Sequence, residues 1–141
     1  MKTLNKKVII EDEKEKMRKQ GKRNKNKGSN FERKIANKLK EKYQVDFVRT
    51  PLSGGFSKTG DTFKGDISVS DDNLEMKLHI ECKNSINWNL KSWIEQAEKD
   101  CPSDRKIAVV FHKNNTNKDY VCLNLDDFLE MIPKNCVVIE R

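Results

Sequence analysis

Residues 77–83 alternate between apolar and polar side chains, which is the pattern of a β-strand with one buried face. Successive side chains of a strand point to opposite faces, so the polar residues share one face: His79, Glu81 and Lys83. The opposite face is apolar. An acid and a base two residues apart therefore lie side by side, next to a predicted core.

A second alternating segment, residues 66–70, precedes this strand and is joined to it through a turn-like sequence. We expect the two strands to pair with Asp66 opposite Glu81, because this register gathers their apolar residues on one side. The apolar pairs would be Ile67 with Ile80 and Val69 with Leu78. Asp66, Glu81 and Lys83 would then converge on the other side. Two carboxylates and one ammonium beside a core indicate a magnesium-dependent site that cleaves phosphodiester bonds.

This pattern also has a simpler interpretation. Charged residues make up 36% of the chain, and a Glu-x-Lys strand often faces solvent. Three neighbouring features favour the catalytic interpretation: an Asp begins the partner strand, a helix that carries Glu32 precedes it, and another helix follows directly.

The helix that carries Glu32 is predicted from its apolar spacing and from a capping box. The apolar series runs from Phe31 to Tyr43 at intervals of four residues, and Ser29 with Glu32 forms the capping box. We therefore expect the helix and the folded domain to begin at Ser29. Glu32 is either a cap that bonds back to the backbone or a residue of the site.

The remaining elements follow from the same periodicities and from turn residues. A continuous apolar run at 107–111 is typical of a central strand buried on both faces. The segment 51–65 is rich in glycine and has no periodicity, which predicts a functional or disordered loop. The other predicted elements are strands at 45–50, 120–123 and 136–139 and helices at 90–101 and 126–132. This order predicts an α/β domain with a mixed central sheet.

The net charge of +7 comes entirely from the first 28 residues, which hold 11 Lys or Arg and 4 Asp or Glu. Residues 29–141 hold 18 of each. We expect residues 1–28 to form a flexible or partly helical basic arm, and 29–141 to form a single nuclease domain. The arm is either a solubilising tail or a phosphate-binding segment, and the nearby phosphodiester site favours the second.

The cysteines and the hydropathy pattern indicate the compartment. The four cysteines are widely spaced and show no metal-binding or disulfide pattern: Cys82, Cys101, Cys122 and Cys136. No apolar run is long enough for a signal peptide or a membrane span. We expect reduced thiols, no membrane contact and a cytoplasmic location in a bacterial, archaeal or virus-infected cell.

Several short motifs together resemble one family. They are Lys27 to Arg33, Arg49, Ser53 to Gly55, Gly65 to Ile67, Ile80 to Lys83, Glu95 to Lys99 and Ala108 to Phe111. In this spacing the chain resembles the PD-(D/E)xK nuclease superfamily, and within it the archaeal-type Holliday junction resolvases. The resemblance covers about the middle three-fifths of the chain and implies a restriction-endonuclease-like core. One departure is that Gly65 stands where the superfamily has Pro.

The resemblance implies a site for Mg²⁺, or for Mn²⁺ as an alternative. Asp66, Glu81 and the Cys82 carbonyl would bind the ion, with waters completing an octahedral shell. Lys83 would hold the attacking water and offset charge in the transition state, or would simply pair with a carboxylate. Glu32 would reach the same site from the first helix.

Further roles come from the same resemblance. Ser53 would touch the scissile phosphate, or would be an ordinary serine of a glycine-rich turn. Gln96 would support the site, although a solvated helix position is the favoured interpretation. DNA contacts are expected from Lys22, Arg23, Lys25, Lys27, Arg33, Arg49 and Ser53.

Three aromatic side chains lie near the predicted site. His79 shares its face and is expected to contact DNA or water one pleat away. Trp88 and Trp93 are expected to pack rather than to stack on bases.

These features together predict a metal-dependent, structure-selective DNA endonuclease. The expected substrate is the four-way junction, cut by paired nicks from a homodimer. The alternatives are a restriction-like or repair nuclease that acts on duplex or flap DNA, and a non-catalytic nucleic-acid-binding protein on a nuclease fold. The intact Asp66, Glu81 and Lys83 argue against the last.

Overall fold

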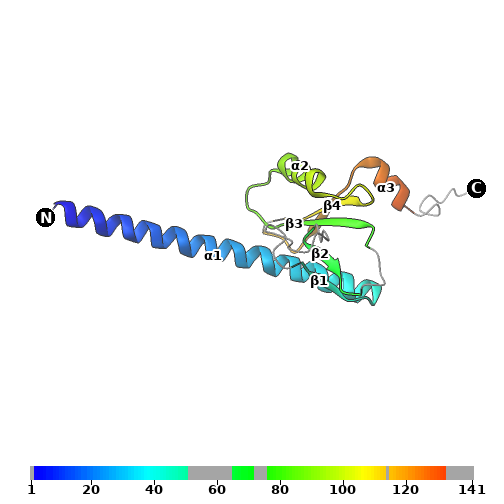
Figure 1. The fold of residues 1–141 in the computed structure, drawn as a ribbon, viewed down its shortest axis with the longest axis horizontal. Helices are drawn as coiled ribbons and strands as arrows, with labels where there is room; N and C mark the ends of the chain where they lie inside the picture. The colour runs from blue at the N-terminus through cyan, green and yellow to red at the C-terminus, as the bar shows by residue number, and fades with distance from the viewer. Residues whose placement is uncertain (1, 51–64, 72–75, 114, 133–141) are drawn as a thin grey trace, which may run out of the picture.

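The described part of the chain contains three helices and five strands (Figure 1). The structure is a computed structural model that describes residues 2–50, 65–71, 76–113 and 115–132, with side chains from residue 11 onward. The elements are α1 (Lys2–Tyr43), β1 (Phe47–Arg49), β2 (Ile67–Val69), β3 (Leu78–Lys83), α2 (Leu90–Asp100), β4 (Lys106–His112), β5 (Asp119–Cys122) and α3 (Leu125–Met131). The predicted strand at 136–139 and the predicted loop up to residue 64 lie outside the described residues.

A mixed three-stranded sheet forms the centre of the fold. Its middle strand is β4, which pairs in parallel with β3 and antiparallel with β5. The apolar run of β4 is buried at Ala108, Val109 and Val110, as predicted for a central strand. Because parallel neighbours need a crossover connection, helix α2 lies between β3 and β4 in the chain. The predicted α/β class with a mixed sheet is confirmed.

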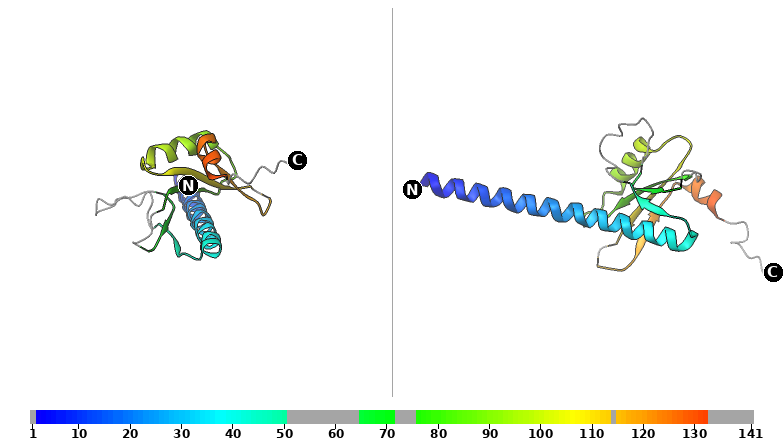
Figure 2. Two further views of the ribbon diagram at one scale, coloured as in Figure 1. Left: turned by 90° about the vertical axis from the view of Figure 1, so that its right-hand side faces the viewer. Right: turned by 60° about the horizontal axis from the view of Figure 1, so that its bottom comes forward.

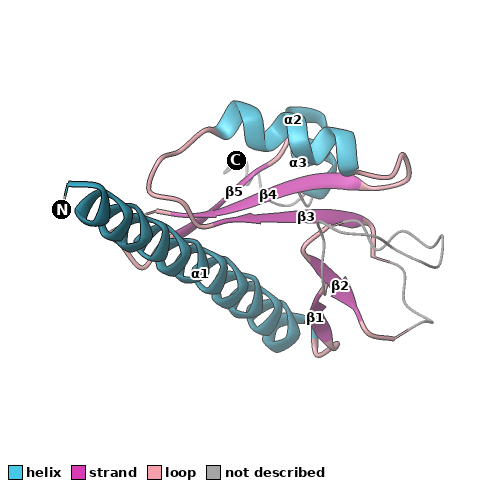
Figure 3. Cartoon of the chain, turned by 60° about the vertical axis from the view of Figure 1, so that its left-hand side comes forward, coloured by secondary structure: helices cyan, strands magenta, loops and turns pink. Residues whose placement is uncertain are grey.

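Helices cover both faces of this sheet (Figure 3). On one face α1 buries Phe31 and Ile35 against Ile80 of β3 and Val110 of β4. On the other face α2 buries Ala97, which has no exposed surface. Both faces of β3 are therefore covered, so any charged residue on this strand must find partners inside the fold.

Helix α1 is much longer than the sequence pattern predicts, since it runs unbroken from Lys2 through Ser29 to Tyr43. The prediction that the helix begins at Ser29 is wrong. A capping box acts only where the chain enters a helix. Residues 11–27 contain many residues with high helix propensity, and a salt bridge joins Lys19 to Glu15 one turn earlier, so the helix continues through them. The segment projects from the sheet as an exposed helix (Figure 2). The division into an arm and a domain at residue 28 stays a prediction.

Strand β2 has a different neighbour from the one predicted. It pairs antiparallel with β1, with Phe47 opposite Val69 and Arg49 opposite Ile67. The backbone bond to β3 runs from the Asp66 N–H to the Ile80 carbonyl, at 2.8 Å. The predicted hairpin register with Asp66 opposite Glu81 is therefore wrong. Alternation determines which face of a strand is buried, but it leaves the choice of neighbour open.

A partly buried carboxylate fixes α1 to the far edge of the sheet. Asp119 of β5 accepts hydrogen bonds from Lys34 and Lys38 of α1, and contacts His112 of β4 at 2.8 Å. Burial alone would raise the pKa of Asp119, but the bonds from Lys38, Lys34 and His112 hold that pKa well below its usual range. Three elements are thus joined at one ionised group.

Gly65 is required by its backbone conformation. Its φ is 109°, in the region that favours glycine, and proline cannot adopt it because its ring holds φ near −65°. A Cβ at this position would lie 3.3 Å from both the His79 Nδ1 and the Ile80 carbonyl oxygen. The departure from the superfamily pattern at this position therefore has a local structural cause.

We expect Gly65→Ala to lower the free energy of unfolding by about 1–3 kcal/mol, because the side chain adds strain at this φ and crowds β3. Gly21→Ala is the matched control. Gly21 lies in the exposed part of α1 with no atom within 4 Å of an added Cβ, so this change should stabilise helix by about 0.5–1 kcal/mol. Denaturant unfolding followed by circular dichroism measures both. If both substitutions changed the free energy of unfolding in the same direction, the strain assigned to Gly65 would be contradicted.

Candidate active site

Two carboxylates meet at the start of β2 and the middle of β3. Asp66 and Glu81 are both buried, with 7% and 6% of their surfaces exposed. The Asp66 carboxylate accepts a hydrogen bond from the Cys82 N–H at 2.7 Å, which holds it over β3. The two acids therefore come together as predicted, although the register that brings them together differs.

Lys83 joins this pair to helix α2. Its Nζ donates to Glu81 Oε1 at 2.6 Å and to Gln96 Oε1 at 2.9 Å. The predicted pairing of Lys83 with a carboxylate is present. Gln96 is exposed on α2, as favoured from the sequence, and it also accepts the hydrogen bond from Lys83. Sequence spacing placed Gln96 on the right helix and could not show which side chain it would meet.

The charge of this cluster is unbalanced. Burial raises the pKa of Glu81, the nearby Asp66 carboxylate raises it further, and the hydrogen bond from Lys83 opposes both effects. Among the described residues, the Asp66 and Glu81 carboxylates lie beside the single ammonium of Lys83. A divalent cation would remove this repulsion, so the donor set fits Mg²⁺, which prefers few carboxylate ligands and several waters.

Cys82 contributes to this site through its backbone. Its buried thiol has a raised pKa, mainly because of burial and then because of the negative charges of Asp66, Glu32 and Glu81. The thiol is therefore a poor anionic ligand. Within the described residues, no three His, Cys, Asp or Glu side chains gather closely enough to hold a metal ion. The Cys82 carbonyl as a further ligand stays a prediction.

Glu32 lies on α1 with 13% of its side chain exposed, and it accepts a hydrogen bond from Arg49 of β1. The capping interpretation of Glu32 is wrong, because the helix continues through this residue. Its carboxylate is close enough to the Cys82 thiol to raise the thiol pKa. Arg49, a predicted DNA contact, is engaged in this ion pair.

His79 is fully buried, and its Nε2 lies 4.0 Å from Glu81 Oε2. The expectation that it contacts DNA or water is wrong, because its side chain has no exposed surface. Trp88 and Trp93 pack against Phe111, with ring centroids 5.1 Å and 6.1 Å away, as predicted.

Apart from Arg49, the predicted DNA contacts fall into three groups. Four of them are exposed side chains along α1: Lys22, Arg23, Lys25 and Lys27. Arg33 is also exposed on α1 and donates to Asn30. Ser53 lies outside the described residues. The exposed lysine and arginine side chains of α1 are accessible to DNA phosphates. Their role in DNA binding stays a prediction.

The comparison with known families decides the class of this site. A family model described as "Phage putative PDDEXK endonuclease" matches residues 23–140. The chain belongs to this PDDEXK endonuclease family. The resemblance to the PD-(D/E)xK superfamily is thereby confirmed, and the protein is a nuclease, for which the family implies a DNA substrate. No curated protein and no solved structure matches the chain. None of the described helices is long and apolar enough to cross a membrane.

We expect Mg²⁺ to stabilise the folded protein by relieving the repulsion between Asp66 and Glu81. The gain should be about 1.4 kcal/mol when free Mg²⁺ is about tenfold above its dissociation constant. Thermal unfolding with MgCl₂ and with NaCl at equal ionic strength measures it. Asp66→Asn keeps the acceptor for the Cys82 N–H and should lose the gain, whereas the exposed Asp126→Asn should keep it. Equal gains in both variants would exclude this site.

Proposed function

We infer that the protein is a divalent-metal-dependent DNA endonuclease whose active site contains Asp66, Glu81 and Lys83. The observation that supports this most is the pair of buried acids joined to Lys83 in a chain of the PDDEXK endonuclease family. Burial of two like charges costs stability, and such unbalanced clusters gather at functional sites. A purely structural role would be served better by apolar residues on β3.

The roles of the side chains follow from their contacts. The Asp66 and Glu81 carboxylates and the Cys82 carbonyl would hold Mg²⁺, with Mn²⁺ as an alternative. When bound, the ion lowers the pKa of a water and offsets charge on the phosphate. Lys83 keeps one N–H beyond its bonds to Glu81 and Gln96, and this N–H can hold the attacking water or a phosphate oxygen. Gln96 holds Lys83 in place.

Glu32 has a supporting role in this proposal. Its ion pair with Arg49 fixes a third carboxylate on α1, on the side of β3 where the Cys82 thiol lies. From there Glu32 would act through water rather than as a direct ligand. Arg49 would position Glu32, and its exposed part would remain available to DNA.

The proposed substrate is the four-way DNA junction, cut by a homodimer. The support is the resemblance in motif spacing to archaeal-type junction resolvases. A symmetric junction needs two opposed nicks, and two copies of this chain would provide two sites. The basic exposed face of α1 would add phosphate contacts that carry no sequence information. Nucleases that act on duplex or flap DNA remain the alternative.

Asp66→Asn, Glu81→Gln and Lys83→Ala should each lower the cleavage rate by at least about 100-fold. Binding to DNA in Ca²⁺ should survive, because affinity comes mainly from phosphate contacts elsewhere. Glu98→Gln changes an exposed carboxylate on α2 and is the control that should retain activity. Cleavage assays in Mg²⁺ and binding assays in Ca²⁺ measure the two effects. A variant that cleaves at the wild-type rate would remove its residue from the site.

The substrate is tested by offering an immobile four-way junction, a flap, a linear duplex and a single strand in parallel. We expect the protein to sediment as a dimer, to prefer the junction at equal length and to nick opposing strands symmetrically. A monomer that cuts linear duplex equally well would contradict the junction assignment, and the broader nuclease assignment would stand.

A further inference from the structure

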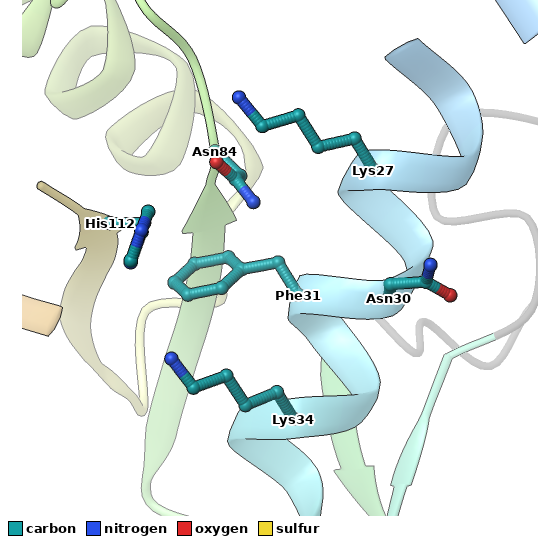
Figure 4. A pocket seen from close by; sticks show the side chains of 6 residues that line it. All are labelled: Lys27, Asn30, Phe31, Lys34, Asn84 and His112. Atoms are coloured by element: carbon teal, nitrogen blue, oxygen red, sulfur yellow. The ribbon is translucent and has the colours of Figure 1, made fainter. Parts of the chain in front are cut away.

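A second polar pocket lies beside the end of β3, on the face of the sheet that α1 covers. It encloses about 260 Å³ and is lined by Lys27, Asn30, Phe31, Lys34, Asn84 and His112. Figure 4 shows Lys27 and Lys34 reaching from α1 past the Phe31 ring, with His112 across from them. None of these side chains belongs to the cluster of Asp66 and Glu81.

The pocket carries an excess of positive charge. Asp119 is the carboxylate that contacts its lining, and it faces Lys34, Lys38 and the His112 imidazole. Lys27 adds a further ammonium, exposed at the rim. Lys27 and Lys34 are the lysines of the lining, and Lys34 shares Asp119 with Lys38, which lies outside the lining, so the pocket favours an anion.

The polar atoms of this pocket are held in place. Asp119 contacts His112 Nδ1 at 2.8 Å, which leaves Nε2 as the other hydrogen-bonding atom of the ring. The Phe31 ring packs against the imidazole and lies 5.8 Å below the Lys34 Nζ. The Asn84 Oδ1 is buried without a hydrogen-bond partner in the described structure. This oxygen can only accept, so a water bound beside the ligand would satisfy it, whereas the Asn84 amide nitrogen is the atom that can donate to an anion.

The position of this pocket relates it to the active site. Asn84 directly follows Lys83, and His112 directly follows Phe111, which is the partner of Lys83 in the parallel register. Neighbouring residues of a strand face opposite sides, so Lys83 and Asn84 point to the two sides of the same strand end. A DNA strand that crosses this end would bring one phosphate to Lys83 and another to the pocket.

The geometry points to a phosphodiester-binding pocket, formed by Lys27, Lys34, Asn84 and His112, that holds a backbone phosphate of DNA next to the scissile one. This inference rests on the proposed DNA-cleaving function and adds a positioning site to it. Lys27 and Lys34 provide charge, the Asn84 amide nitrogen can donate a directed hydrogen bond, and His112 forms the wall of the pocket across from them. Such a site would fix the register of the DNA strand over Lys83.

The histidines allow a direct test, because the chain contains only His79 and His112. Their imidazole NMR signals are followed while a short DNA duplex or a four-way junction is added in Ca²⁺. The His112 signal should shift on binding, and His112→Gln assigns that signal. Inorganic phosphate alone is the second probe. DNA binding that leaves His112 unmoved, or a shift produced only by inorganic phosphate, would overturn the inference.

Matched lysine variants provide the second measurement. Lys27→Ala should weaken DNA binding about tenfold, as expected for loss of a charged hydrogen bond in a pocket. Lys25→Ala removes an exposed charge of α1 outside the pocket and should weaken binding only about twofold. If both variants lost the same DNA affinity, Lys27 would contribute only nonspecific electrostatic attraction, and the inference would be overturned.

Cleavage assays separate the pocket from the proposed function. The substrate is DNA in which one phosphate is replaced by a neutral methylphosphonate. The wild-type cleavage rate should drop when the replaced phosphate is next to the bond that is cut. In Lys27→Ala, the cleavage rate should no longer depend on where the replacement lies. If DNA shifts His112 but is not cleaved in Mg²⁺, the proposed function fails and the pocket stands. If DNA is cleaved without involvement of His112 or Lys27, only the pocket fails.

Discussion

The hydrogen bond from the Cys82 N–H to the Asp66 carboxylate is the contact on which the candidate site depends. β2 pairs with β1, so the sheet register alone does not bring Asp66 to Glu81. The bond of 2.7 Å, together with the backbone bond from Asp66 to Ile80, attaches the start of β2 to β3. Gly65 makes this approach feasible, because any side chain there would meet the backbone of β3.

Strand β3 contributes residues both to the hydrophobic core and to the candidate active site. β3 uses Ile80 and Cys82 to pack against α1, and the alternating positions place Glu81 and Lys83 on the face covered by α2. Burial makes Glu81 harder to ionise, and the nearby Asp66 adds to this effect. This cost is partly offset because Lys83 donates to one oxygen of Glu81 and the Cys82 N–H donates to the Asp66 carboxylate. Within the described residues, two carboxylates beside the Lys83 ammonium suit a cation.

Helix α1 serves the fold and the proposed DNA contacts at the same time. Its apolar side closes the core through Phe31 and Ile35, and Asp119 fixes it to the far edge of the sheet. The same helix carries Glu32 toward β3 and Lys27 and Lys34 toward the second pocket. The two candidate sites therefore share one rigid element, and a helix of this length keeps their relative positions constant.

Much of the local structure could be predicted from residue periodicity. Alternation identified β3 and placed Glu81 and Lys83 on one face, and the apolar run identified β4 as a central strand. These predictions succeeded because side-chain direction has a fixed period in a strand and in a helix. The same patterns, with the residue types in them, also indicated the pairing of two acids with one base and the family to which the chain belongs.

The tertiary structure decided which residues meet. The neighbour of β2, the partner of Gln96, the burial of His79 and the pocket around His112 depend on contacts between distant segments, and no local pattern contains them. The start of α1 was mispredicted for the related reason that a capping signal has no effect inside a continuing helix. Sequence by itself determined the type of most described elements and the side of β3 to which its residues point, because both follow from local backbone geometry. Only folding determined the neighbours, because many pairings bury the same apolar faces equally well.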